Sequence, residues 1–307
     1  MVTLASRPVD GRRNFPSGLN PSTSNTMRSS IITSALLLFG AVQADPGAKK
    51  NTGGPIDASI LAHTGEPAGK EIKIANNLTV YISPPPKSPR TKPRSQSAIL
   101  LLTDVFGLNL LQNKLLADSF ARAGYLTLVP DLFAGSPAPS DINDPASANF
   151  SIPAFLAAHQ PPVTDPIIAS AISHLRGSLN ISSIAAAGYC FGGRYALRVV
   201  NPSPGGADVA FAAHPSLLTD EEISGVEKPV SVAAADRDEL LTAARRAEVE
   251  GLLLGAGGRY QVGVYGGTPH GFAVRANYSV ESERFGKEGA FCRRWGGLMS
   301  FWWGGGE

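Results

Sequence analysis

The stretch that most constrains the fold is Gly188-Tyr189-Cys190-Phe191-Gly192-Gly193, which follows the apolar residues 185–187. This order predicts a strand, a sharp turn and a helix. A nucleophile at the top of a buried strand needs small neighbours, because the strained turn brings nearby chain close together. Serine usually occupies the central position, and here the residue is Cys190. The alternative is that Cys190 is a buried cysteine acting as a small hydrophobic residue.

Apolar runs and helical patterns alternate along the rest of the chain. We expect strands at residues 72–74, 78–82, 97–103, 125–129, 181–187, 207–212, 229–235 and 260–265. We expect helices at residues 110–123, 152–159, 165–179, 191–200, 241–254 and 280–303. This alternation predicts an α/β protein with a mostly parallel sheet and helices on both faces. The Pro-rich and Ser-rich segment 132–166 is predicted to cover part of the functional site.

Chemically active side chains follow several of these strands directly. In chain order they are Asp104, Cys190, the acids Asp236 and Asp238, and His270. Ligands of open α/β sheets bind at the carboxyl ends of the strands, so these residues are candidates for one site. The order nucleophile, acid, histidine is typical of an α/β-hydrolase catalytic triad. For Asp104, the structural alternative is that it only caps the following helix.

Four other histidines are assigned structural positions. His214 also follows a predicted strand, but Pro215 directly behind it indicates a tight turn, and we interpret His214 as a packing or pocket-lining residue. His63 lies among turn residues and is interpreted as a loop histidine. His159 and His174 lie on or near helical stretches and are interpreted as surface histidines.

Four motifs in this order resemble the dienelactone hydrolase family. They are residues 188–193, 102–109, 124–132 and 269–272, and the resemblance extends from about residue 57 to the final helix. It implies an α/β-hydrolase fold in which Cys190 is the nucleophile, His270 the base and Asp238 the acid that orients it. Asp236 is the fallback for the acid. The backbone N–H groups of Phe191 and Val105 are expected to hold the oxyanion.

Two positions depart from the family pattern. Bacterial members carry a glutamate, implicated in handling the resting thiol, where this chain has the shorter Asp104. Members that act on dienelactone also clamp the substrate carboxylate with arginines. Arg275, just past His270, is the counterpart expected here, and Arg194 is a weaker candidate. The resemblance therefore specifies the family more closely than the substrate.

Composition excludes several classes of protein. The formal net charge of +2, without a run of five basic residues, does not fit a nucleic-acid-binding protein. The two cysteines, Cys190 and Cys292, allow at most one disulfide, which a nucleophilic Cys190 would forbid. The spacing of His, Cys, Asp and Glu shows no metal-binding motif, and hydrolysis by a thiol needs no cofactor.

The first 55 residues are interpreted as a leader and an extended lead-in, followed by one hydrolase domain at 56–307. Residues 27–45 have the charge, apolar core and small-residue exit of a secretory signal peptide, with cleavage after Ala44. The apolar run is shorter than the roughly 20 residues that span a bilayer, so no membrane contact is expected once the leader is removed. Secretion is therefore predicted. Residues 1–26, rich in Arg and Ser, leave a cytoplasmic or organellar location as the alternative.

Together these features predict an enzyme that hydrolyses small carboxylic esters or lactones through a Cys-His-Asp triad and a thioester intermediate. The alternatives are a hydrolase-like protein that binds small molecules without turnover, and a redox-sensing thiol at Cys190.

Overall fold

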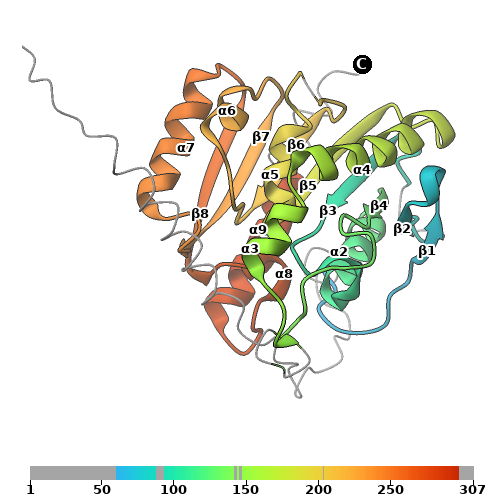
Figure 1. Ribbon diagram of the computed structural model, residues 1–307, viewed down its shortest axis with the longest axis horizontal. Coiled ribbons are helices and arrows are strands. Elements are labelled where there is room, and N and C mark those ends of the chain that lie inside the picture. The colour runs from blue at the N-terminus through green and yellow to red at the C-terminus, as the bar shows by residue number, and fades with distance from the viewer. Residues whose placement is uncertain (1–59, 88–92, 142–143, 145–146, 203, 297–307) are drawn as a thin grey trace, which may run out of the picture.

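The computed structural model describes residues 60–87, 93–141, 144, 147–202 and 204–296 (Figure 1). One sheet has the strand order β1-β2-β4-β3-β5-β6-β7-β8. Its strands are β1 (Lys70–Lys73), β2 (Thr79–Ser83), β3 (Ser97–Leu102), β4 (Leu126–Pro130), β5 (Ser183–Tyr189), β6 (Val209–Ala213), β7 (Val230–Arg237) and β8 (Tyr260–Pro269). The pairs β1–β2 and β2–β4 are antiparallel, and every other pair is parallel. The prediction of a mostly parallel sheet is confirmed.

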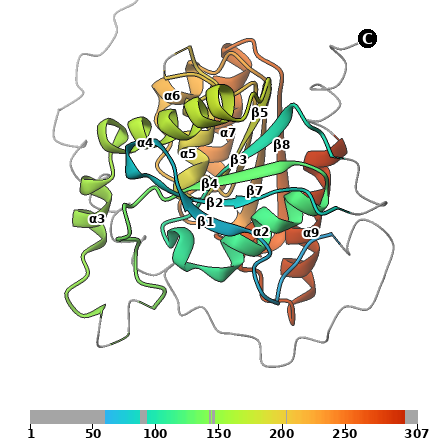
Figure 2. The same ribbon diagram turned by 90° about the vertical axis from the view of Figure 1, so that its right-hand side faces the viewer.

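Helices cover both faces of the sheet (Figure 2). They are α2 (Leu111–Arg122), α3 (Ile152–Ala158), α4 (Pro161–Ser173), α5 (Phe191–Arg198), α6 (Asp220–Ser224), α7 (Ala243–Gly255), α8 (Phe272–Arg275) and α9 (Glu281–Gly296). Helices α2 and α9 lie on one face, where Phe120 and Phe291 stack with ring centroids 5.1 Å apart. Helices α4, α5 and α7 lie on the other face.

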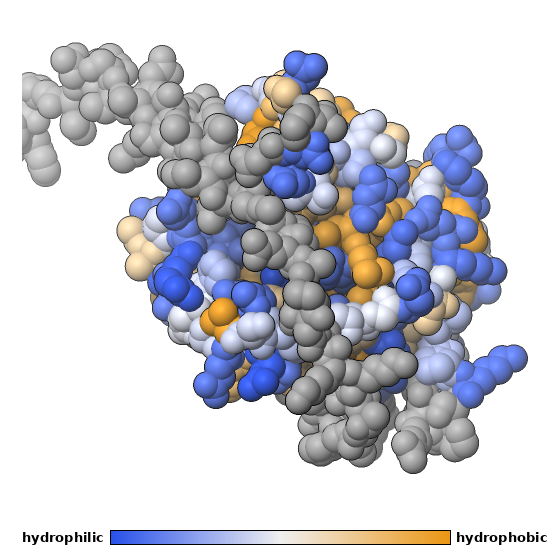
Figure 3. Space-filling view, turned by 90° about the horizontal axis from the view of Figure 1, so that it is seen from below, coloured by the Kyte–Doolittle hydropathy of each residue, from blue (hydrophilic) through white to orange (hydrophobic). Residues whose placement is uncertain are grey.

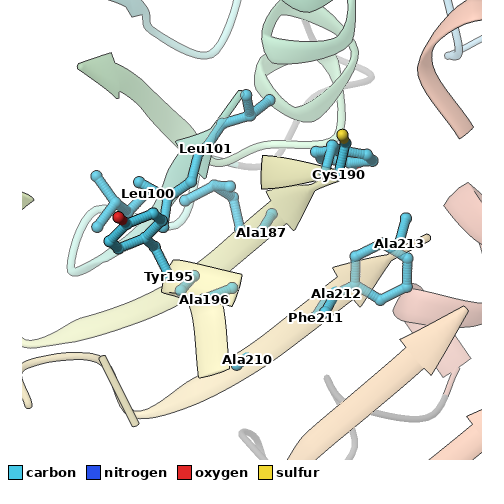
Figure 4. Close-up of a cluster of buried hydrophobic side chains, with 14 of the residues drawn as sticks. Leu100, Leu101, Ala187, Cys190, Tyr195, Ala196, Ala210, Phe211, Ala212 and Ala213 are labelled. Atoms are coloured by element: carbon cyan, nitrogen blue, oxygen red, sulfur yellow. The ribbon is translucent and has the colours of Figure 1, made fainter. Parts of the chain in front are cut away.

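The central strands form the core because their side chains are apolar on both faces. Every residue from Ala98 to Leu102 in β3 is fully buried, and all five residues of β6 are buried. This is the pattern expected of a parallel sheet between two helix layers. Alanines dominate β5 and β6, and their small side chains allow α5 to approach the sheet closely around Cys190 (Figure 4). The molecule seen from below has a mainly hydrophilic surface, with an apolar patch near its middle (Figure 3).

The structure differs from the expected elements in a few places. Helix α4 begins four residues earlier than expected, at Pro161, because proline is favourable in the first turn of a helix. Strand β7 extends through Arg237, so Asp236 lies within the strand instead of after it. Helices α6 and α8 were not predicted, because five and four residues are too few to show a helical period. The short α6 begins with a capping box formed by Thr219 and Glu222.

Some expectations lie outside the described residues. These are the signal peptide, its cleavage after Ala44, the boundary at residues 55 and 56, and the end of the last helix beyond Gly296. Within the described part of the chain, none of the helices combines the length and apolarity needed to cross a bilayer.

Candidate active site

Cys190 lies in a strained turn between β5 and α5, the elbow formed by residues 188–193. Its φ of 51° and ψ of −113° are unusual for a residue with a side chain, a conformation that costs on the order of 1–3 kcal/mol. Hydrogen bonds to neighbouring loops hold the turn. The N–H of Cys190 donates to the carbonyl of Ala213 (3.1 Å), and the N–H of Gly192 donates to that of Thr103 (3.0 Å). Cys190 is 5% exposed.

The flanking glycines are required by space. A Cβ atom on Gly188 would lie 2.1 Å from the carbonyl oxygen of Gly192. A Cβ atom on Gly192 would lie 2.2 Å from the carbonyl oxygen of Leu102 in the neighbouring strand. Both contacts are with backbone atoms, which cannot move aside without displacing the strand or the helix. The spacing of glycines around Cys190 therefore has the physical cause expected of a nucleophile elbow.

His270 and Asp238 meet at the carboxyl edge of the sheet. His270 follows β8, and its Nδ1 lies 2.9 Å from Oδ2 of Asp238, which follows β7. The other oxygen of Asp238, Oδ1, accepts hydrogen bonds from the N–H groups of Leu240 (2.9 Å) and Leu241 (3.2 Å). The exposed Asp236 instead accepts a hydrogen bond from the N–H of Thr268. Of the two acids left open by the strand order, Asp238 is the one that contacts His270.

The charge on His270 depends on its neighbours. Burial acts to lower its pKa, but Cys190 and Asp238 outweigh burial and raise the pKa of His270 to about 10. Nε2, the nitrogen that does not face Asp238, has no hydrogen-bond partner among the described residues. The raised pKa favours the imidazolium form of His270 at neutral pH.

Asp104 is wholly buried behind this site. Its Oδ1 accepts hydrogen bonds from Nδ2 of Asn113 (2.9 Å) and the N–H of Phe106 (3.3 Å), and its Oδ2 lies 3.3 Å from Nε of Arg275. Burial raises the pKa of Asp104, and the charge of Arg275 and the hydrogen bond from Asn113 act in the opposite direction. Asp104 thus does more than cap a turn. Both of its oxygens face groups other than the Cys190 thiol.

The two arginines considered for a substrate clamp already have acidic partners. Arg275 lies beside Asp104, with its guanidinium 4.8 Å from the centre of the Phe106 ring. Arg194 is buried and paired with Glu222, at 2.8 Å between Nη2 and Oε1. Contact between Arg275 and a substrate stays a prediction.

The two expected oxyanion donors lie at the ends of adjacent strands. Phe191 is the first residue of α5, where a backbone N–H has no partner within the helix. Val105 follows Asp104 in the loop after β3, and its carbonyl is held by the N–H of Ala138 (2.9 Å). Their joint action on an oxyanion stays a prediction. The described part of the chain contains no group of three or more His, Cys, Asp or Glu side chains placed to hold a metal ion.

The loop after β6 contributes two residues whose contacts the sequence did not reveal. His214 has a φ of 36° and is fully buried, and its ring centroid lies 4.9 Å from that of His270. Burial lowers the pKa of His214 well below 6.5, so the ring is neutral. Ser216 places Oγ 3.7 Å from Sγ of Cys190. The sequence held one clue to these contacts, namely that both residues directly follow a strand. Because β6 pairs with β5 in parallel, the loops after the two strands leave the same edge of the sheet.

Segment 132–166 packs directly over the residue that follows the nucleophile, as predicted. The Phe133 ring lies 5.3 Å from that of Phe191, 5.2 Å from that of Phe155 in α3, and 5.1 Å from that of His159. His159, interpreted from sequence as a surface residue, is half-buried in this aromatic cluster. The cluster fixes the side chain beside Cys190.

Comparison with known proteins gives consistent matches. The sequence profile of the dienelactone hydrolase family matches residues 81–301. The hydrolase pyvD of Aspergillus violaceofuscus is 39% identical over 75% of this chain and 89% of its own length. The hydrolase tropI of Talaromyces stipitatus is 33% identical over the same shares of the two chains. Among solved structures, the thermophilic esterase Est2 of Thermogutta terrifontis matches with a TM-score of 0.56 and 16% identity, over 78% of this chain and 97% of that one.

Proposed function

This chain belongs to the dienelactone hydrolase family, has the α/β-hydrolase fold and is a carboxylic ester hydrolase, and from this premise we propose that it cleaves small-molecule esters or lactones through Cys190, His270 and Asp238. The observation that carries the proposal is the 2.9 Å contact between His270 and Asp238 beside a cysteine in a strained elbow. The runner-up from the sequence, Asp236, does not contact the histidine.

In the first half of the reaction, the Cys190 thiolate attacks the carbonyl carbon while His270 carries the thiol proton. The carbonyl oxygen becomes an oxyanion, and the N–H groups of Phe191 and Val105 donate to it, each contributing about 3 kcal/mol. The intermediate collapses when the C–O bond breaks and His270 gives its proton to the leaving alcohol oxygen. An ester gives the free alcohol and a thioester on Cys190, whereas a lactone gives one thioester on Cys190 that still carries the new hydroxyl group.

In the second half, water cleaves the thioester. His270 Nε2 takes a proton from water, and the resulting hydroxide attacks the thioester carbonyl carbon. The C–S bond then breaks, the acid product leaves, and the thiolate and imidazolium are restored. Asp238 holds the ring so that Nδ1 carries a proton and Nε2 faces the reaction throughout.

Asp104 has a supporting place in this scheme, as the partner of Arg275. Its Oδ1 accepts hydrogen bonds from Asn113 and Phe106, and its Oδ2 lies 3.3 Å from Nε of Arg275 without a hydrogen bond. The charge of His270 also acts to lower the pKa of Asp104. Burial raises the pKa of Asp104 and the charge of Arg275 acts in the opposite direction, so the two side chains support each other behind the site. This differs from direct handling of the thiol, which the family resemblance implied for the longer glutamate.

The experiment that tests the proposal is capture of the acyl group on Cys190. The enzyme is mixed with a panel of aryl esters and lactones, quenched in acid, and analysed by peptide mass spectrometry. We expect an acyl mass on the Cys190 peptide and loss of turnover in Cys190→Ala, while Cys292→Ala remains active. Equal turnover by wild type and Cys190→Ala would refute the proposal, and binding of the panel without turnover would favour the non-catalytic alternative.

We also propose that the mature protein is secreted, on the basis of the leader at residues 27–45. The asparagines of its four Asn-Xaa-Ser/Thr sequons, Asn77, Asn149, Asn180 and Asn277, are all exposed, which suits a glycosylated secreted protein. When the full chain is expressed in a fungal host, the protein recovered from the culture medium should begin at Asp45. Retention of the chain inside the cell with residue 1 intact would overturn this proposal.

A further inference from the structure

We propose that Ser216 is a further catalytic residue, whose hydroxyl donates a hydrogen bond to the Cys190 thiolate and stabilises it before substrate binds. The inference rests on the proposed function, because it concerns the same nucleophile. Its basis is the 3.7 Å separation of Ser216 Oγ from Cys190 Sγ, at two side chains that are 4% and 5% exposed.

The backbone of Ser216 is bound to the turn that contains Cys190. Its N–H donates to the carbonyl of Cys190 (3.2 Å), so the backbones of the two residues are joined directly. Pro215 packs against the elbow so closely that a Cβ atom on Gly193 would lie 2.8 Å from it. Upstream, the N–H of His214 donates to the carbonyl of Ala233 (2.7 Å), which ties the loop to β7. These contacts fix the backbone of Ser216 beside Cys190, at the position from which its hydroxyl reaches the sulfur.

Within the described residues, Ser216 supplies the one side-chain hydrogen bond that reaches Cys190, and His270 acts on the sulfur through its charge. Asp104, which is shorter than the glutamate of the bacterial family members, directs its oxygens to Asn113, Phe106 and Arg275. Nor does the Ser216 hydroxyl have a competing acceptor in the part of the chain described here. A thiolate can only accept, so once the sulfur is ionised the hydroxyl must be the donor.

The consequence is a thiolate that is stabilised from two sides. His270 supplies positive charge, and Ser216 supplies a hydrogen bond to the charged form of the sulfur. A hydrogen bond to the charged form of an acid favours ionisation, and burial strengthens the effect because water does not compete. Removal of the hydroxyl should therefore shift ionisation of the thiol to higher pH without changing the order of steps in hydrolysis.

The test is the pH dependence of alkylation at Cys190. Wild type, Ser216→Ala, Ser216→Thr and Ser216→Val are treated with iodoacetamide from pH 4 to 10, and modification is followed on the Cys190 peptide separately from Cys292. We expect the pH of half-maximal rate to rise by about one unit in the Ala and Val variants. The Thr variant, which keeps the hydroxyl, should stay near wild type. The Thr and Val side chains have the same shape, so this pair isolates the hydroxyl even if the Ala variant folds poorly.

The pH dependence of kcat/KM is a second test of the proposal. In the Ala and Val variants, kcat/KM should fall about 10-fold at pH 6 and recover at higher pH, where the thiol ionises without help. Ser231→Ala is the matched control, because Ser231 is an equally buried serine in β7. A general packing defect would lower activity at every pH, so only a pH-dependent loss supports the proposal.

Two results would overturn it. The first is an alkylation profile of Ser216→Val that coincides with that of Ser216→Thr, and the second is a loss of activity in Ser216→Ala that is the same at every pH. Either result leaves the proposed function intact if wild type still forms the acyl-enzyme. Failure of wild type to form any acyl-enzyme refutes the proposed function instead, and alkylation still reports on the contact between Ser216 and Cys190.

Discussion

Replacement of Asp238 by asparagine keeps His270 in place but changes which of its ring nitrogens carries the proton. The carboxylate Oδ1 accepts hydrogen bonds from Leu240 and Leu241, so an amide at this position must keep its oxygen toward those N–H groups. Its NH2 group then faces Nδ1 of His270, where Oδ2 lies 2.9 Å away in the wild type. An NH2 donor forces Nδ1 to be the acceptor and moves the ring proton to Nε2. The nitrogen that should receive the thiol proton is then already protonated.

The size of the effect follows from the hydrogen bond that the substitution removes. A hydrogen bond to a charged group is worth about 1.5–3 kcal/mol, and each 1.36 kcal/mol is a factor of ten in rate, so the bond alone accounts for about 10- to 150-fold. The wrong tautomer adds to this loss, and we expect kcat/KM to fall by about 100-fold or more in Asp238→Asn.

The assay is steady-state hydrolysis of an aryl ester, normalised to the amount of folded enzyme. Asp236→Asn is the control, because that exposed side chain contacts the N–H of Thr268 and not the histidine. It should retain activity within about threefold of wild type. An Asp238→Asn variant that keeps more than a third of wild-type activity, or equal losses in the two variants, would show that the described acid–base pair is not the one used.

Further predictions concern stability. Gly188→Ala should destabilise the fold by at least about 3 kcal/mol in urea unfolding, because the new methyl group would meet backbone at 2.1 Å, whereas Gly251→Ala on the exposed face of α7 should be neutral or stabilising by up to about 1 kcal/mol. Burial lowers the pKa of Lys287 to about 7, against about 10.4 in an unfolded chain, so between these values the unfolded state binds more protons and wild type gains stability with rising pH. Relative to Lys287→Met, that gain should be about 2 kcal/mol from pH 7 to 9, and parallel curves for the two proteins would contradict the described burial of the amine. Burial likewise holds the pKa of His214 below its unfolded value, so wild type should lose stability as pH falls below 6.5, and a His214→Phe variant should lose less; equal slopes would refute this.

The sequence was sufficient to predict the elements that depend on residues close together in the chain. Strands β3 and β6 are continuous apolar runs because they are buried on both faces, and such runs need no partner to be recognised. The elbow was also predictable, since glycines at 188 and 192 are required by steric contacts within the same turn and with the neighbouring strand. The order of Cys190, Asp238 and His270 followed from the alternation of strands and helices.

Pairings between distant loops were not predictable in the same way. Ser216 is an ordinary serine in the sequence, and it becomes notable only because parallel pairing of β5 and β6 brings two strand ends together. Arg275 was expected to face a substrate, yet its charge lies beside Asp104, which is distant in sequence. The aromatic cluster around Phe133 has the same character, because its rings come from a loop, from α3 and from the elbow. Such contacts depend on tertiary packing, which the hydrophobic periodicity of a single segment does not reveal.

In the proposed mechanism, Cys190 reacts as a thiolate although its side chain is nearly buried. A buried thiolate is costly unless opposite charge or hydrogen-bond donors replace the water that surrounds an exposed one. Here the strained turn places the sulfur at the N-terminus of α5, where backbone N–H groups and the helix dipole favour negative charge. The same turn brings it beside Ser216 and within the influence of His270, whose positive charge is in turn held by Asp238. The neutral His214 against His270 adds bulk without adding competing charge. The backbone strain at Cys190 is therefore coupled to its chemistry, because relaxing the turn would move the sulfur away from the groups that stabilise its charge.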